Sequence, residues 1–214
     1  MEHNYSIERQ SMAIQVYNFI KKLILSGELK GGERIPEEKV ASQFGISRTP
    51  IREAMKRLEE YGLIKVKPRS YAVVVSLRRE EVEQIALIRA QLEILSVSLL
   101  AENGKDADFE ALEHLSEEHL ELISKNDIAG AYEKDSQFHL EISRLTNNQH
   151  LYEIFQKIDA KVQLARLTIH LPINKLIKYI KQHKVIVHAI KSRDKRKAKS
   201  LIRKHIMDQL KDYI

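Results

Sequence analysis

The stretch Ile35–Tyr61 has the sequence IPEEKVASQFGISRTPIREAMKRLEEY, and it predicts two short helices joined by a tight turn at Gly45. In the second helix Arg48, Arg52 and Lys56 are four residues apart, so their side chains share one face. The opposite face carries the apolar residues Ile51, Met55 and Leu58. A helix with an apolar back and a basic front can pack on a small core and enter the major groove of DNA.

The residues around this stretch complete a small helical domain. Apolar residues at helical spacing predict a first helix over 11–25. Pro36 opens the second helix, which stops at Gly45. We expect Thr49 to cap the third helix, with Pro50 at its first position, where the missing amide hydrogen costs nothing.

A β-hairpin is expected directly after the third helix. Residues 63–77, LIKVKPRSYAVVVSL, alternate in polarity and are rich in valine, which predicts two strands around a turn at 68–70. Three helices followed by a hairpin make a winged helix-turn-helix, which we place at residues 1–77.

The rest of the chain, residues 78–214, is predicted to be helical almost throughout. Breaks at glycine, asparagine, aspartate and proline separate the segments. The expected helices are 79–102, 106–125, 127–145, 148–169, 172–192 and 194–213. Helices of this length with short loops favour an all-helical antiparallel bundle. The fold class is therefore mainly α, in two domains that meet at Arg78.

The composition agrees with a mainly helical, soluble protein. The 214 residues are 43% hydrophobic and include only 7 Gly and 4 Pro. The absence of cysteine excludes disulfides and thiolate metal sites. No apolar run approaches the roughly 20 residues that span a bilayer, and MEHNYSIERQ at the N-terminus lacks the pattern of a signal peptide. We therefore expect a cytoplasmic protein with no membrane partner.

Charge is unevenly distributed around the net value of +6. Residues 78–156 have 7 Lys and Arg against 17 Asp and Glu, a net of −10. Residues 157–214 have 16 against 4, a net of +12. Opposite signs in consecutive segments suggest helices that attract one another within one domain. The basic run KSRDKRKAKS at 191–200 is either a solvated helix end or a second nucleic-acid patch.

Four residues in the helical half have the chemistry of metal ligands. Asp135 and His139 lie one helical turn apart and can reach a common point. His183 and His205 belong to two later helices, and a bundle brings facing helices together around its axis. One carboxylate and three imidazoles suit Zn²⁺, Ni²⁺, Mn²⁺ or Fe²⁺. Spacing alone leaves the site open, because Asp/His pairs four residues apart are common on helices.

The remaining histidines have no convergent spacing, and we expect them at the surface or in the core. They are His3, His114, His119, His150, His170 and His188. His188 follows His183 by five residues, about 140° around a helix, so the two side chains cannot easily face one metal ion.

These motifs resemble the GntR family of bacterial transcription regulators, in the FadR-like branch whose C-terminal half is an all-helical FCD effector domain. In the DNA-binding half the resemblance rests above all on GISRTPIREAMKRLEEYGLI at 45–64. The effector half matches at IRAQLE (88–93), DSQFH (135–139), HKVIVHAI (183–190) and KSLIRKHI (199–206). The resemblance covers nearly the whole chain. Asn147 stands where the family has a glycine, and asparagine also tolerates a left-handed backbone.

The resemblance implies a set of DNA contacts. Arg48 and Arg52 would contact bases or inner phosphates, because a guanidinium fork matches guanine or phosphate with two hydrogen bonds. Contacts to the DNA backbone, which fix register, are implied for Arg34, Lys39, Thr49, Lys56 and Arg69. One module covers only a few base pairs, so we expect a homodimer on a double-stranded operator of two-fold symmetry.

The resemblance also implies a ligand-binding site in the helical half. It implies one divalent transition metal per chain, most often Zn in a purified sample. The four implied ligands are Asp135, His139, His183 and His205. Arg89 is implied to point into a cavity and hold the carboxylate of a small organic-acid effector. The alternative for Arg89 is an exposed ion pair with Glu93. Arg166 is a second candidate for effector binding.

The expected function is that of a ligand-responsive transcription regulator, most often a repressor in this family, and not an enzyme. One alternative is a regulator with a purely structural metal and no effector. A second is an enzyme whose metal activates water, although no motif places a catalytic acid or base. A third is a nonspecific DNA-coating protein, whose affinity would depend on salt alone.

Overall fold

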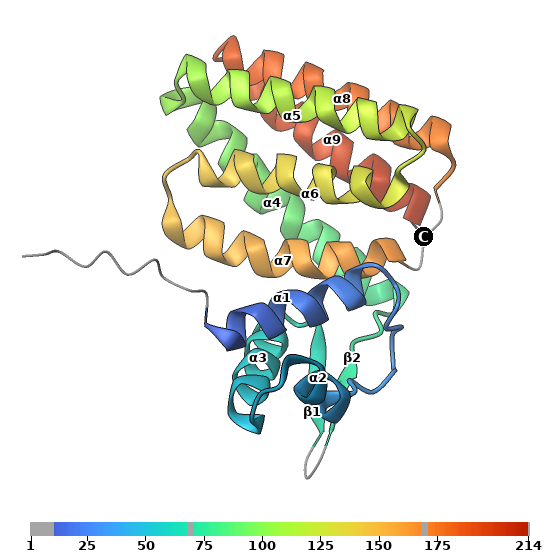
Figure 1. Cartoon of the computed structure of the whole chain (residues 1–214). Coiled ribbons are helices and arrows are strands. Elements are labelled where there is room, and N and C mark those ends of the chain that lie inside the picture. The colour runs from blue at the N-terminus through green and yellow to red at the C-terminus, as the bar shows by residue number, and fades with distance from the viewer. Residues whose placement is uncertain (1–10, 68–70, 168–170, 214) are drawn as a thin grey trace, which may run out of the picture. The chain divides into compact units, whose positions relative to one another are not determined.

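The computed structural model of the chain describes residues 11–67, 71–167 and 171–213. The chain divides into two compact units, Met1–Ser76 and Leu77–Ile214 (Figure 1). As predicted, the fold is mainly α-helical. In the described residues, β-structure is confined to a single strand pair and one isolated bridge beside it.

The N-terminal unit has the element order of a winged helix-turn-helix. Its elements are α1 (Met12–Leu25), α2 (Glu37–Phe44), α3 (Arg48–Glu60), β1 (Ile64–Lys67) and β2 (Tyr71–Val74). Helix α1 packs against α3. The buried side chains that join the elements include Val16, Ile20, Val40, Ile51 and Leu58. The basic face of α3 is therefore presented by a helix whose other face is held in a core.

The turn between α2 and α3 follows the prediction, but the start of α3 does not. Gly45 ends α2 with a φ of 62°, a left-handed conformation that glycine adopts without a Cβ clash. Helix α3 begins at Arg48, with Ser47 at the N-cap position, so the prediction that Thr49 caps it is wrong. Pro50 still lies within the first turn, where backbone amides have no helical acceptor, so the helix starts earlier at no cost.

The wing is a two-stranded antiparallel sheet. Ile64 lies opposite Val74 in its register. The backbone amide of Val74 also donates to the carbonyl of Glu33 at 2.9 Å, which ties the wing to the loop before α2. The predicted turn at 68–70 lies outside the described residues.

The second unit is a helical bundle. Its helices are α4 (Arg79–Asn103), α5 (Asp106–Ser124), α6 (Ile128–Arg144), α7 (Gln149–Leu167), α8 (Ile173–Lys191) and α9 (Lys195–Tyr213). The predicted boundaries agree to within one residue, apart from the end near 169, which is outside the described residues. Helix α4 packs against α6, α7, α8 and α9, and α5 lies beside α6 and α8 (Figure 1).

Ion pairs join acidic and basic helices at the surface of this bundle, as the charge distribution predicts. They are Lys184–Glu117 at 3.3 Å, Lys191–Glu113 at 3.2 Å and Lys195–Glu102 at 2.8 Å. Exposed pairs contribute only about 0–1 kcal/mol each, so the apolar core carries most of the stability. Two lysines of the basic run at 191–200 are thereby part of the bundle surface.

Helix α4 buries two charged residues among apolar ones and leaves several apolar residues exposed. By length and composition it could cross a membrane, contrary to the expectation that no apolar run is long enough. It is nevertheless a core helix of the bundle, and half of its apolar stretch is buried. Its inner face includes the buried residues Arg89 and Glu93. Its outer face leaves Leu87, Ile88 and Leu95 about half exposed.

Candidate functional site

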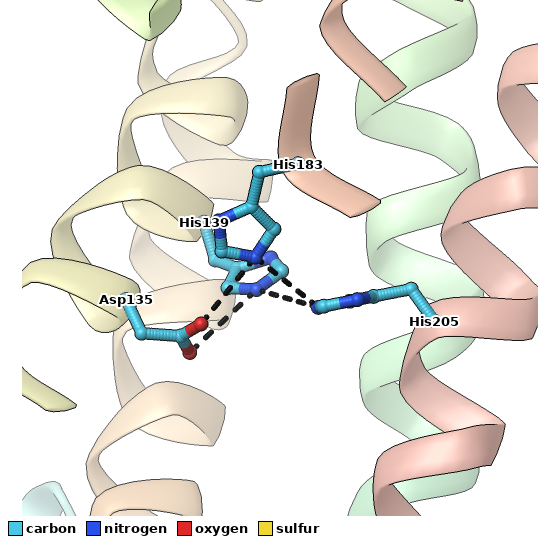
Figure 2. A group of neighbouring side chains, drawn as sticks. All are labelled: Asp135, His139, His183 and His205. Carbon is cyan, nitrogen blue, oxygen red and sulfur yellow. Dashed lines mark hydrogen bonds and ion pairs between the residues drawn. The ribbon is translucent and has the colours of Figure 1, made fainter. Parts of the chain in front are cut away.

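Three helices bring the four predicted metal ligands together. Asp135 and His139 come from α6, His183 from α8 and His205 from α9, and all four are buried. One ligand atom from each lies within 4.8 Å of the others (Figure 2). Segments far apart in sequence therefore converge on a single point inside the bundle.

The distances between the imidazoles fit a common cation. His205 Nε2 lies 3.3 Å from Nε2 of His139 and 3.3 Å from Nε2 of His183. Two nitrogens bound to zinc at 2.0–2.1 Å with a tetrahedral angle are about 3.3–3.4 Å apart. Asp135 Oδ1 lies 3.4 Å from His183 Nε2. Each of these distances thus matches the ligand–ligand distance in a tetrahedral zinc site.

Hydrogen bonds at the far side of two rings determine which nitrogens carry protons. His139 Nδ1 lies 2.6 Å from a Glu93 carboxylate oxygen, and His205 Nδ1 lies 2.8 Å from the Gln182 amide oxygen. Both oxygens accept, so both Nδ1 atoms donate, and the lone pairs of Nε2 point inward. Two lone pairs facing each other at 3.3 Å cannot hydrogen-bond, but a shared cation satisfies both.

The charge states also suit metal ligands. Burial lowers the pKa of His183 and His205 well below 6.5, so both imidazoles are neutral near pH 7. Burial tends to raise the pKa of the Asp135 carboxyl, but the Arg166 guanidinium outweighs it and holds that pKa well below its usual range. An ionised carboxylate and neutral imidazoles are the forms that bind metal.

Arg166 contacts this cluster directly. Its guanidinium forms a buried ion pair with the Asp135 carboxylate, and its Nη1 donates to the Tyr132 carbonyl at 3.3 Å. A small cavity next to the cluster is lined by His119, Tyr132, Asp135, Arg166, Tyr179 and Gln209, among others. The second candidate for effector binding is therefore placed at this cavity.

Arg89 contacts the cluster indirectly, through Glu93 and Gln209. Its Nε donates to Glu93 at 2.6 Å and its Nη1 to the Gln209 amide oxygen at 3.2 Å. The predicted alternative of an exposed Arg89–Glu93 pair is wrong, because both side chains are buried. Within the described residues Arg89 Nη2 has no partner. Arg89 lines a second small cavity, whose walls are mainly apolar residues of α4, α7 and α9.

The basic face of α3 is exposed as predicted. Its exposed residues are Arg48, Thr49, Arg52 and Lys56, and Lys39 of α2 is exposed as well. Arg48, Arg52 and Lys56 make no ion pair within the described part of the chain. Arg34 lies 4.1 Å from the centre of the Tyr71 ring on β2. Arg69 lies outside the described residues.

Both halves match models of known families. The model of the FCD domain matches residues 84–208, and that of bacterial regulatory proteins of the gntR family matches residues 13–74. The chain belongs to the GntR family.

Several GntR regulators resemble this chain along most of their length. The uncharacterized regulator YdhC of Bacillus subtilis is 31% identical, over 90% of this chain and 86% of that protein. McbR of Escherichia coli K12 is 28% identical, over 86% and 85%. The solved structure of E. coli McbR/YncC covers 96% of this chain and 98% of its own, with 25% identity and a TM-score of 0.85. These relatives are transcription regulators, which confirms that the protein is a regulator and not an enzyme.

Sequence reasoning missed the polar residues that surround the four predicted ligands. His119, treated as an ordinary histidine, lies beside His183 with ring centroids 5.7 Å apart, and burial lowers its pKa to about 4. Glu93, Gln182 and Gln209 hydrogen-bond histidines of the predicted ligand set. Glu93 lies in the IRAQLE match but was expected only as a partner of Arg89, and the two glutamines belong to no motif. The only available signal was helical spacing, since Gln209 follows His205 by one turn. His114, His150 and His188 are exposed, as expected, and His3 and His170 lie outside the described residues.

Proposed function

We propose that this GntR regulator is a cytoplasmic, homodimeric repressor whose FCD domain holds a divalent transition metal and a small organic-acid effector. The observation that carries the metal site is the convergence of Asp135 with three imidazoles, two of which, His139 and His205, have the lone pair of Nε2 directed inward. Bound there, a metal ion would supply a Lewis-acidic centre for an anionic oxygen of the effector. Ligand binding would change operator affinity through its different affinities for two arrangements of the protein.

Elemental analysis of the purified protein, paired with native mass spectrometry, tests this proposal. We expect about one Zn, Ni, Mn or Fe ion per chain, together with the mass of a small organic acid. A protein that takes up neither Zn²⁺ nor Ni²⁺ after incubation would rule out the metal site, although the DNA-binding domain would be unaffected.

The effector would be held by the positive charges beside the cluster. Arg89 offers an unpartnered, buried Nη2, and Arg166 lines the cavity that includes Asp135. A carboxylate is the ligand group that pairs best with a guanidinium.

A purely structural metal with no effector is a second candidate, because all four ligands are buried. It is favoured if chelation unfolds the bundle, and rejected if the metal-free protein stays folded and binds an organic acid only after metal is restored.

The DNA contact of Arg52 leads to a specific prediction. Arg52→Ala is expected to cost about 1–3 kcal/mol on a cognate operator, because a base-contacting arginine is lost. Lys56→Ala is the matched control on the same exposed face. If Lys56 contacts only phosphate, its removal weakens cognate and scrambled DNA to the same extent. Fluorescence anisotropy with both DNAs measures this. An equal loss on both DNAs for Arg52→Ala would exclude it from base recognition.

The exposed apolar face of α4 supports the homodimer. Ile88→Glu places a charge on this face. We expect the dissociation constant of the dimer to be at least about tenfold higher in the variant than in the unmodified protein, since an unpaired buried charge is costly. Val185→Glu on α8 is the control, because Val185 is exposed to a similar degree, 47% against 50%. Analytical ultracentrifugation distinguishes the variants. An unchanged dimer for Ile88→Glu would move the interface elsewhere.

A further inference from the structure

Gln209 on α9 contacts both Arg89 and His205. Its side-chain oxygen accepts a hydrogen bond from Arg89 Nη1 at 3.2 Å, and its amide nitrogen lies 3.1 Å from His205 Nε2. The side chain is 3% exposed. Gln209 also lines both cavities, the one beside Asp135 and the one beside Arg89.

The orientation of the Gln209 amide is determined by its neighbours. A guanidinium only donates, so the amide oxygen must face Arg89 and the amide nitrogen must face His205. His205 donates from Nδ1 to Gln182, and its Nε2 is therefore an acceptor. Gln209 thus donates to the same lone pair that a metal ion would use.

We propose that Gln209 is a displaceable cap on the metal centre, an inference that rests on the metal site proposed above. In the metal-free protein it satisfies the inward lone pair of His205. A cation at the centre takes that lone pair, and the Gln209 N–H must leave. A buried donor without an acceptor is costly, so the freed amide needs a new oxygen.

The freed amide would find its acceptor in the effector. Gln209 lines both cavities and shares the mainly apolar one with Arg89, whose buried Nη2 has no partner within the described residues. Metal binding therefore creates a pair of donors suited to one anionic oxygen. In this way metal occupancy prepares the site for a carboxylate, and Gln209 is the residue that links the two.

Substitutions of the two glutamines that contact His205 test the cap, with Ni²⁺ as the probe. Gln209→Leu removes the group that competes with the metal, and we expect Ni²⁺ to bind about two- to tenfold more tightly, the equivalent of one hydrogen bond. Gln182→Leu removes the acceptor that orients His205, and we expect Ni²⁺ to bind about 10- to 100-fold more weakly. Competition with a chelator of known affinity measures both constants.

The two substitutions are expected to change the Ni²⁺ affinity in opposite directions, so a general loss of structure cannot explain both results. Circular dichroism of the metal-free variants confirms folding, and Gln209→Met takes the place of a leucine variant that does not fold, since methionine has no donor either. Weaker or unchanged Ni²⁺ binding in a folded Gln209 variant overturns the cap. If the unaltered protein itself binds no Ni²⁺, the proposed metal centre is wrong, and the cap fails with it.

Discussion

Arg166→Met is expected to lower the free energy of unfolding of the metal-free protein by about 3–5 kcal/mol. Arg166 is the buried partner of the Asp135 carboxylate. Removing one partner of a buried ion pair leaves the other charge uncompensated in a low-dielectric interior. Urea unfolding in the presence of a chelator, near neutral pH, measures the loss.

Two rescues separate this electrostatic cause from lost packing. Adding Asp135→Asn to Arg166→Met removes the orphaned charge, and we expect at least about half of the lost stability to return. Saturating Zn²⁺ should also stabilise the single variant more than the unaltered protein, because the cation replaces the missing positive charge. Failure of both rescues would mean that Asp135 does not depend on Arg166 for its charge balance.

His205→Ala is expected to reduce bound metal to near zero, as is His139→Ala. Each substitution removes a direct ligand, and loss of an outer partner alone costs about 10–100-fold in affinity. His188→Ala on α8 is the control, because His188 is exposed and should leave metal content unchanged. Elemental analysis of the three purified variants gives the result. Retention of metal by His205→Ala would remove His205 from the ligand set.

Much of the backbone could be predicted from local signals. The bundle helices begin and end where apolar periodicity meets asparagine, glycine or proline. Asn147 has the left-handed φ of 55° expected where the family has a glycine. The starting residue of α3 was missed because a proline in the first turn is compatible with more than one start.

The partners of the site could not be predicted in the same way. Glu93 and His139 are 46 residues apart, and no local pattern indicates that their side chains meet. The buried face of α4 is mainly apolar, but it includes Arg89 and Glu93, while Ile88 is half exposed. Because apolar residues lie on both faces of this helix, apolar periodicity alone does not indicate that Arg89 and Glu93 are on the buried face. The four predicted metal ligands converge, but their role in binding stays a prediction.

Helix α4 has the buried pair Arg89 and Glu93 on one face and the exposed apolar residues Leu87, Ile88 and Leu95 on another. Ile88 and Arg89 are consecutive, so they project about 100° apart and move together. If the proposed effector moves α4 through Arg89, it also moves the apolar face proposed to pair with the second subunit. Thermodynamic linkage then requires that subunit pairing change effector affinity by the same factor that the effector changes pairing. Ultracentrifugation with and without metal and organic acid would measure this linkage. A dimer dissociation constant that changes with neither would show that α4 does not couple effector binding to dimerisation.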